Sequence, residues 1–176
     1  RLAVVASASG SGKTTLGRAL ADRMGATFVE LDALRHGPDW TEATTDEMRA
    51  KVAPLVATDR WVTDGTYSAL GGLIAERADL IVWLDLPPWT WIPRLLKRST
   101  RRLLFREELW NGNRETVRGV FLDADGVFRH AFRAYFFRRH ELAARLAPYP
   151  VIRLRSSAEV RRFLEAFPRR LASASS

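Results

Sequence analysis

The feature that most constrains this chain is a glycine-rich segment near its start, Ser9-Gly10-Ser11-Gly12-Lys13-Thr14-Thr15. It follows the apolar run 2–6 and precedes a helical pattern over 16–24, which predicts a turn between a strand and a helix. Glycines let the backbone wrap closely around phosphate oxygens, and the start of a helix adds a partial positive charge. The order strand, glycine-rich turn, Gly-Lys-Thr, helix therefore predicts a phosphate-binding loop.

Residues of this loop have separate chemical roles in the prediction. Lys13 can reach the β- and γ-phosphates of a nucleoside triphosphate, and the Thr14 hydroxyl can ligate Mg²⁺. Ser7 departs from the pattern G-x-x-x-x-G-K-[ST], because it stands where the first glycine is expected. The two glycines nearest the phosphates are present, so we still expect nucleotide binding. The residues expected to hold the nucleotide are Ser9, Gly10, Ser11, Gly12, Lys13, Thr14 and Thr15.

Composition narrows the class of protein. The chain has 176 residues, 47% of them hydrophobic and 27% charged, which fits one globular domain with a real core. It has no cysteine, no apolar run long enough to span a membrane and no visible signal peptide, so we expect a cytoplasmic location. A net charge of +8 favours an anionic partner, and in the absence of RNA-binding or zinc-finger signatures we favour nucleotide phosphates over nucleic acid.

Strand-like and helical patterns alternate along the chain. This alternation predicts a three-layer α/β domain over residues 1–176, with about five parallel strands and a loose tail at 172–176. Ligands bind such sheets at the carboxyl ends of the strands. The expected strands are 2–6, 27–31, 60–63, 80–85 and 151–154. The expected helices are 12–25, 44–56 with a kink or interruption at Pro54, one capped by Thr90, 127–146, and 156–167.

Three aspartates stand at the expected strand ends. Asp64 follows an apolar strand and precedes Gly65, which makes it our candidate for the carboxylate on the magnesium side. Asp85 ends the most hydrophobic strand and is its rival. Asp32 has a catalytic and a structural interpretation. It could orient an acceptor hydroxyl or act as a general base, or it could cap the following loop.

Two polar stretches follow the fourth strand. Arg94, Arg98, Arg101 and Arg102 have helical spacing that predicts one shared face. This face is either solvated or a cationic lid over a polyphosphate, and we favour a lid region of about 94–126, because arginine binds phosphate bidentately and stays charged. The second stretch is either a binding surface or a structured turn between helices, and it contains Trp110, Asn111, Asn113, Arg114 and Glu115.

Five segments carry a family resemblance that covers nearly the whole chain. The sequence resembles the P-loop kinases related to adenylate kinase. More closely, it looks like the subgroup labelled topology modulation protein or adenylate-kinase-related ATPase. The resemblance implies a P-loop NTPase fold with strand order 2-3-1-4-5. The matching segments are 10–14, 30–34, 61–68, 82–87 and 110–115.

The resemblance also assigns individual residues. It implies that Asp64 matches the Asp-Gly aspartate that serves Mg²⁺ through water, which decides between Asp64 and Asp85. Arg94 and Arg98 match arginines that open the adenylate kinase lid and contact phosphates. Thr66-Tyr67 replaces the expected Phe-Pro-Arg, so the arginine that grips a nucleoside monophosphate is missing there.

Together these features predict an ATP- and Mg²⁺-dependent phosphotransferase that moves the γ-phosphoryl group to a nucleotide or a small hydroxylated metabolite. The alternative is a regulatory module that binds or hydrolyses ATP and contacts nucleic acid through basic helices. A GTPase is disfavoured because no Asn-Lys-x-Asp segment is present. The prediction includes no membrane partner and leaves the oligomeric state open. The expected catalytic residues are Lys13, Asp32, Arg94, Arg98 and Arg102, the metal-site residues are Thr14 and Asp64, and the substrate-binding residues are Arg35, Asp64, Tyr67, Trp110, Asn111, Asn113 and Arg114.

Overall fold

The computed structural model describes residues 1–105 and 127–168, with only the helical backbone over 127–134. Within these residues a single parallel sheet has the strand order β2-β3-β1-β4-β5, which confirms the predicted topology. The strands are β1 (Leu2–Ala6), β2 (Thr27–Val29), β3 (Trp61–Thr63), β4 (Leu80–Leu84) and β5 (Val151–Leu154).

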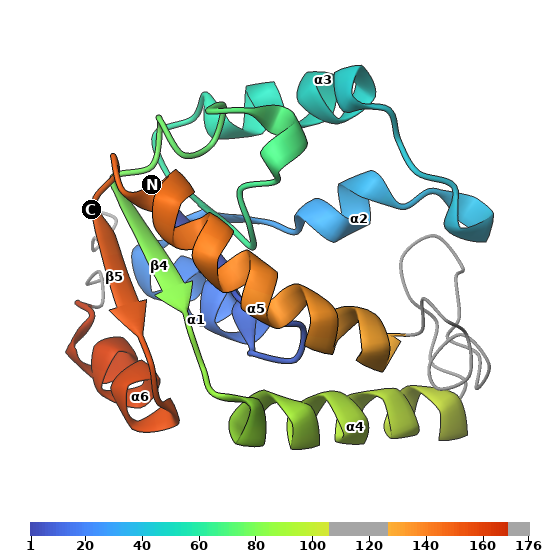
Figure 1. Cartoon of the computed structure of the whole chain (residues 1–176). Helices are drawn as coiled ribbons and strands as arrows, with labels where there is room; N and C mark the ends of the chain where they lie inside the picture. The colour runs from blue at the N-terminus through green and yellow to red at the C-terminus, as the bar shows by residue number, and fades with distance from the viewer. Residues whose placement is uncertain (106–126, 169–176) are drawn as a thin grey trace.

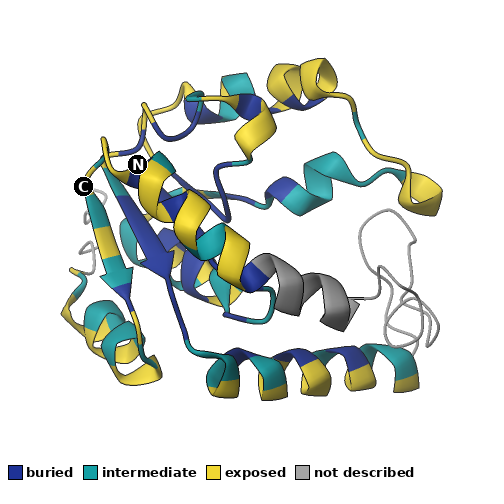
Figure 2. Cartoon of the chain, in the orientation of Figure 1, coloured by how far each residue is buried: buried dark blue, intermediate teal, exposed yellow. Residues whose placement is uncertain are grey.

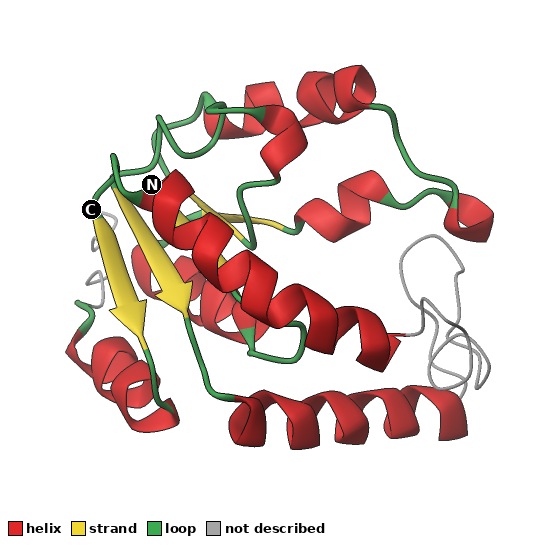
Figure 3. Cartoon of the chain, viewed as in Figure 1, coloured by secondary structure: helices red, strands yellow, loops and turns green. Residues whose placement is uncertain are grey.

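Helices cover both faces of this sheet, so the three-layer prediction is also confirmed (Figure 1; Figure 3). Within the described ranges, no helix combines the length and the apolar character needed to cross a membrane. The helices are α1 (Lys13–Met24), α2 (Leu31–Arg35), α3 (Thr45–Val56), α4 (Pro88–Leu104), α5 (Val127–Leu146) and α6 (Ser157–Ala166), with 3-10 turns η1 (Pro38–Trp40) and η2 (Ser68–Leu70).

The apolar strands are explained by burial on both faces. In a strand successive side chains point to opposite faces, so Val4 packs with α1 and α6 while Val5 packs with α3 and α5. Sheets covered on both faces need continuous apolar strands, and β4 is buried along nearly all of its length (Figure 2). The two cores fix the sheet between its helices and hold the carboxyl ends of the strands at one edge.

Three local expectations are wrong. The second strand ends at Val29, and Leu31 begins α2, so Asp32 lies in the first turn of a helix and not at a strand end. The chain turns there because Leu31 is fully buried and its N–H donates to Asp64. Helix α3 is not interrupted at Pro54, one of the two outcomes expected there, and runs to Val56, whose buried side chain holds the last turn against the core.

The third correction concerns the start of α4. The helix begins at Pro88 and has Pro87 as its N-cap, whereas Thr90 was expected to cap it. Proline suits this position because the first helical N–H groups have no partner within the helix. Two other helices are capped by side chains, since the hydroxyls of Thr44 and Ser156 accept from the N–H groups of Glu47 and Glu159.

Candidate functional site

The phosphate-binding loop joins β1 to α1, and its conformation depends on its glycines. Gly10 and Gly12 have φ of +80° and +92°, a region that favours glycine. A Cβ on Gly10 would also meet the Trp91 carbonyl oxygen and the Leu95 Cβ at 3.0 Å, so α4 packs directly on the loop. The Ser11 hydroxyl donates to the Ala8 carbonyl at 2.8 Å and closes the turn from inside. The loop therefore has a fixed shape, set by its own backbone and by α4.

Asp64, at the end of β3, is bound directly to this loop. The Thr14 hydroxyl donates to its Oδ2 at 3.0 Å, and the Leu31 N–H donates to its Oδ1 at 3.0 Å. Lys13 Nζ donates to the Asp64 carbonyl oxygen at 3.3 Å. Burial raises the pKa of the Asp64 carboxyl, and the nearby Lys13 charge opposes that rise. The three predicted residues Lys13, Thr14 and Asp64 thus come together.

The chemistry of this group fits magnesium. The Thr14 hydroxyl and the Asp64 carboxylate are hard oxygen donors, held within one hydrogen bond of each other. Magnesium retains several waters and needs only one or two such side chains beside substrate phosphates. Among the described residues, no group of three or more His, Cys, Asp or Glu side chains could hold a metal ion.

A cavity of about 560 Å³ lies beside the loop. Five of the predicted site residues, Ser9, Lys13, Asp32, Arg35 and Tyr67, line it together. It therefore joins a phosphate-binding surface to a second polar surface large enough for another small molecule. The rest of its wall is formed by Val5, Ala6, His36, Glu42, Gly65, Thr66, Ser68, Arg138, Glu141, Leu142 and Arg145.

Asp32 and Tyr67 form the polar centre of this second surface. The Tyr67 hydroxyl donates to Asp32 Oδ1, and the Arg35 guanidinium lies 5.3 Å from the centre of the Tyr67 ring. Burial, together with the Asp32 carboxylate, raises the pKa of Tyr67, so the phenol stays protonated and donates. Tyr67 has φ of +42°, a backbone conformation whose strain is typically held at functional sites. Arg35 also pairs with Glu42 at 2.6 Å.

Helix α5 supplies wall residues that the sequence did not single out. Arg138, Glu141, Leu142 and Arg145 are spaced i, i+3, i+4 and i+7, which places them on one side of the helix. Arg145 donates to the Thr66 hydroxyl at 3.2 Å and pairs with Glu141 at 3.3 Å. The sequence does show charges repeated along one face of this helix. It does not show that this face lies against the loop, because the two segments are far apart in the chain.

The arginines of α4 divide into two pairs. At about 100° per residue, Arg98 and Arg102 fall on the stripe of Trp91 and Leu95, which meets the loop, and both are half-buried. Arg94 and Arg101 are exposed on the neighbouring face. Arg94 donates to the Ser157 hydroxyl of α6 at 2.9 Å, so it is directed away from its expected position over the phosphates.

Two further outcomes concern the lid. Among the described residues, the cavity wall includes none of the four α4 arginines. The lid prediction therefore remains a prediction. The other expected substrate-binding residues, Trp110, Asn111, Asn113 and Arg114, lie outside the described residues, as does the tail 172–176.

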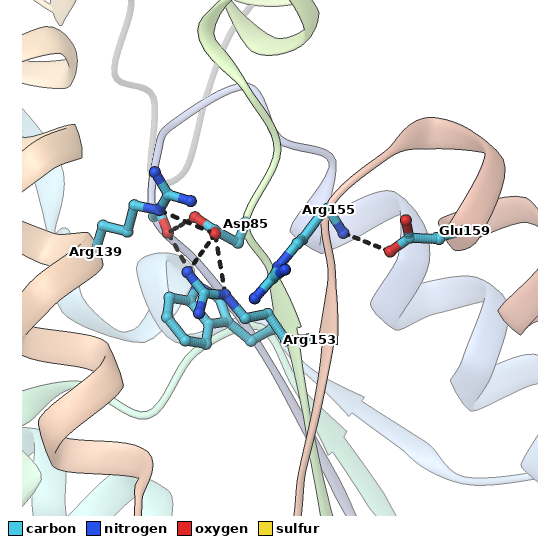
Figure 4. A network of polar contacts seen from close by, with 7 residues as sticks. Asp85, Arg139, Arg153, Arg155 and Glu159 are labelled. Carbon is cyan, nitrogen blue, oxygen red and sulfur yellow. Dashed lines mark hydrogen bonds and ion pairs between the residues drawn. The ribbon is translucent and has the colours of Figure 1, made fainter.

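Asp85, the rejected magnesium candidate, has its charge compensated within the protein. Its carboxylate is buried and accepts from Arg153 Nη2 at 2.6 Å and from Arg139 Nε at 3.0 Å (Figure 4). Ser7, the departure from the loop pattern, donates its hydroxyl to Asp85 Oδ1 at 3.0 Å. These contacts agree with the choice of Asp64 over Asp85.

Comparison with known proteins relates the chain to kinases. No protein-family model matches it. Two shikimate kinases, from Synechococcus elongatus and Synechococcus sp., are 35% identical to it over 107 residues, which cover 51% of this chain and 52% of each enzyme. The chain thus spans about half the length of the curated relatives it matches.

Solved structures confirm the fold. A sugar kinase from Janibacter sp. has a TM-score of 0.53 at 20% identity, with 94% of this chain and 92% of that chain covered. A shikimate kinase from Acinetobacter baumannii in complex with shikimate has a TM-score of 0.54 at 18% identity, with 93% and 90% covered. The chain therefore has the fold of these kinases and, over about half of its length, sequence similarity to shikimate kinases. Its assignment to the topology modulation subgroup stays a prediction.

Proposed function

We propose that this chain is an ATP- and Mg²⁺-dependent kinase that transfers the γ-phosphoryl group to a hydroxyl of a small metabolite or a nucleotide. The observation that carries the proposal is the shared cavity, which Lys13 of the loop and the Asp32 carboxylate both line. A triphosphate site and a group able to accept a hydroxyl proton thus face one space. The names of the relatives, shikimate kinase and sugar kinase, support the same class of reaction.

The nucleotide half of the site consists of the loop and Asp64. Backbone N–H groups of residues 9–15 bind the phosphates, and Lys13 reaches the β- and γ-phosphates. Thr14 and Asp64 hold Mg²⁺, which neutralises charge on the phosphates when bound. Phosphoryl transfer depends mainly on positioning and charge neutralisation, and this half supplies both.

The acceptor half is centred on Asp32. Its carboxylate orients the acceptor hydroxyl and receives the proton as the phosphoryl group transfers. Since Tyr67 holds Oδ1, we assign this step to Oδ2. After Asp64-Gly65 the chain has Thr66-Tyr67 in place of the expected Phe-Pro-Arg, so the arginine for a nucleoside monophosphate is missing, and this favours a hydroxylated metabolite over a nucleotide. Arg35 and Arg145 offer charge for anionic groups on that metabolite.

The remaining predicted residues complete the proposal. Arg98 and Arg102, on the stripe that meets the loop, close over the phosphates in the reactive state, whereas Arg94 stays bound to Ser157. The polar stretch with Trp110, Asn111, Asn113 and Arg114 contacts the acceptor.

A panel of acceptors tests the proposal. ATP consumption is measured with sugars, hydroxylated acids and nucleoside monophosphates, each with and without Mg²⁺. Transfer is expected with at least one acceptor, and Lys13→Ala is expected to abolish it while thermal unfolding stays unchanged. Lys51→Ala, on an exposed face of α3, is the matched control and keeps full activity. Unchanged ATP turnover in Lys13→Ala contradicts the assignment.

A second candidate function has one observation in its favour. The chain has a net charge of +8, and Arg94 and Arg101 are exposed on α4. An ATP-dependent module that binds nucleic acid would use such a surface. Salt titration of binding to a DNA or RNA duplex separates the candidates, because a steep salt slope with tight binding favours the module. Absence of binding at physiological salt leaves the kinase.

A further inference from the structure

A buried network connects the start of the phosphate-binding loop to helix α5. Its centre is Asp85, whose side chain is 0% exposed directly after β4. Three elements donate to this one carboxylate. Ser7 of the loop donates to Oδ1 at 3.0 Å, while Arg139 of α5 and Arg153 of β5 donate to Oδ2 at 3.0 and 2.6 Å (Figure 4).

Ser7 is an integral part of this network. Its hydroxyl donates to Asp85 and accepts from Trp83 Nε1 at 2.9 Å, and its own N–H donates to the Leu84 carbonyl at 3.2 Å. A glycine at this position would remove a hydrogen-bond partner from both Asp85 and Trp83 in a buried region, which is unfavourable. Ser7, which departs from the loop pattern, therefore satisfies hydrogen bonds of Asp85 and Trp83 that a glycine could not.

Arg153 makes the network rigid on its other side. Its Nε and Nη2 both donate to Asp85 Oδ2, and its guanidinium lies 4.1 Å from the centre of the Trp83 ring. Planar stacking with charge-assisted hydrogen bonds leaves an arginine few alternative conformations. The Asp85 carboxylate is therefore fixed in position, and whatever it binds is fixed with it.

Helix α5 connects Asp85 to the cavity. Arg139 is bound to Asp85, and its neighbours Arg138, Leu142 and Arg145 line the cavity beside the loop. The loop start and the helix that forms the acceptor wall are thus held by one carboxylate, so that order in the loop favours order in the helix. Two sites are coupled when one structural element responds to both.

We propose that Asp85 is a positioning residue that couples the phosphate-binding loop to α5, so that nucleotide binding orders the acceptor wall. The inference rests on the proposed function in one respect, the binding of a nucleotide by the loop. Ser7 and Arg139 are its contacts with the loop and with α5. The resident Arg153 anchors it to the sheet.

Amide hydrogen exchange with Mg²⁺·ADP as the probe tests this coupling. In the wild-type chain the nucleotide is expected to slow exchange in the loop and, by about tenfold, in α5 residues 135–146. Ser7→Ala and Asp85→Asn are expected to keep the slowing in the loop and lose it in α5. Ser7→Gly, which restores the usual loop residue, is expected to behave like Ser7→Ala.

A matched serine serves as the control. Ser99 in α4 is fully buried, and its hydroxyl has no hydrogen-bond partner among the described residues, so Ser99→Ala should retain the wild-type response. Slowing of α5 in Ser7→Ala equal to the wild type overturns the coupling and leaves the proposed function standing. Failure of the wild-type chain to bind Mg²⁺·ADP in calorimetry overturns both. If Asp85→Asn does not fold, the two Ser7 variants decide the question.

Discussion

Asp64 and Asp85 occupy equivalent places in the sheet but have different partners. Both follow a buried strand, both contact the loop, and the exposed fractions of the whole residues are 1% and 3%. Asp64 accepts from a hydroxyl and a backbone N–H, whereas Asp85 accepts from two guanidiniums and a hydroxyl. The Asp64 carboxylate is therefore available to a cation, whereas the Asp85 carboxylate is already paired with two guanidiniums of the protein. The position of an aspartate at a strand end therefore does not determine its role. Its hydrogen-bond partners do.

The difference arises from the neighbouring strands. Strand β4 pairs with β5 in a register that places Arg153 opposite Trp83, two residues before Asp85. The guanidinium can then stack on the indole and reach the carboxylate. Strand β3 pairs with β2, and the chain that leaves β2 presents the Leu31 N–H to Asp64. Sheet order thus gives one aspartate a cationic neighbour and the other a neutral donor.

The largest expected effect is that of Asp64→Asn on catalysis. Turnover should fall about 10²–10³-fold, because the magnesium side of the site loses its carboxylate. The free energy of unfolding should not fall, since burial already disfavours the charged carboxyl and raises its pKa. Steady-state kinetics and urea unfolding measure the two effects. Lower stability with full turnover would give Asp64 the role that we assign to Asp85.

Asp85→Asn should show the opposite balance. Removing the carboxylate leaves Arg139 and Arg153 without their shared partner, and the free energy of unfolding should fall by about 3 kcal/mol. Asp79→Asn is the matched control, because Asp79 pairs with Arg1 at 2.7 Å on the surface and should lose less. Denaturant unfolding of the three chains checks this, and equal losses at both aspartates would contradict a buried network.

The sequence predicted the parts of the molecule that depend on local pattern. The loop is recognised from seven consecutive residues, and the apolar runs identify all five strands of the sheet. Asp32 was placed near the acceptor because it follows the second strand, although it lies in the first turn of α2, and it lines the cavity together with Tyr67. Motif and periodicity were sufficient for these residues.

What the sequence did not give are contacts between distant segments. Arg139 lies within the buried stripe of Tyr135, Leu142 and Leu146, and a charge in such a stripe needs a partner. Nothing local identifies that partner as Asp85, 54 residues away. The same holds for Ser7, whose hydroxyl acts through a residue 78 positions later. Only the assembled sheet shows these pairs.

Two arginines of α4 also differ in their partners, as Asp64 and Asp85 do. Arg98 lies on the stripe that meets the loop, and Arg94 is bound to Ser157 of α6. Arg98→Gln should lower turnover about tenfold or more, because a charge-assisted contact with phosphate is lost. Arg94→Gln should change turnover less than about twofold. Parallel kinetics of the two variants measure the difference. Equal losses would place both arginines over the phosphates, as the sequence alone predicted.

The smallest expected effect concerns the third aspartate. Asp32, like Asp64, accepts from a neutral donor: the Tyr67 hydroxyl binds Oδ1, which leaves Oδ2 for the proposed base. Tyr67→Phe removes that donor but keeps the ring beneath Arg35. The hydrogen bond orients the carboxylate, and its loss should lower kcat about five- to tenfold, or about 1 kcal/mol, with little change in the KM for ATP.

Tyr149→Phe is the control for this variant, since Tyr149 packs against the core formed with α3 and α5 and should keep wild-type turnover. The kinetic parameter that changes decides the role of Tyr67. A fall in kcat means that Tyr67 acts through the base, whereas a rise in the KM for the acceptor alone means that its hydroxyl binds the acceptor. If neither parameter changes, Asp32 is held by the fold alone. It would then resemble Asp85, a carboxylate whose partners are structural, more than Asp64.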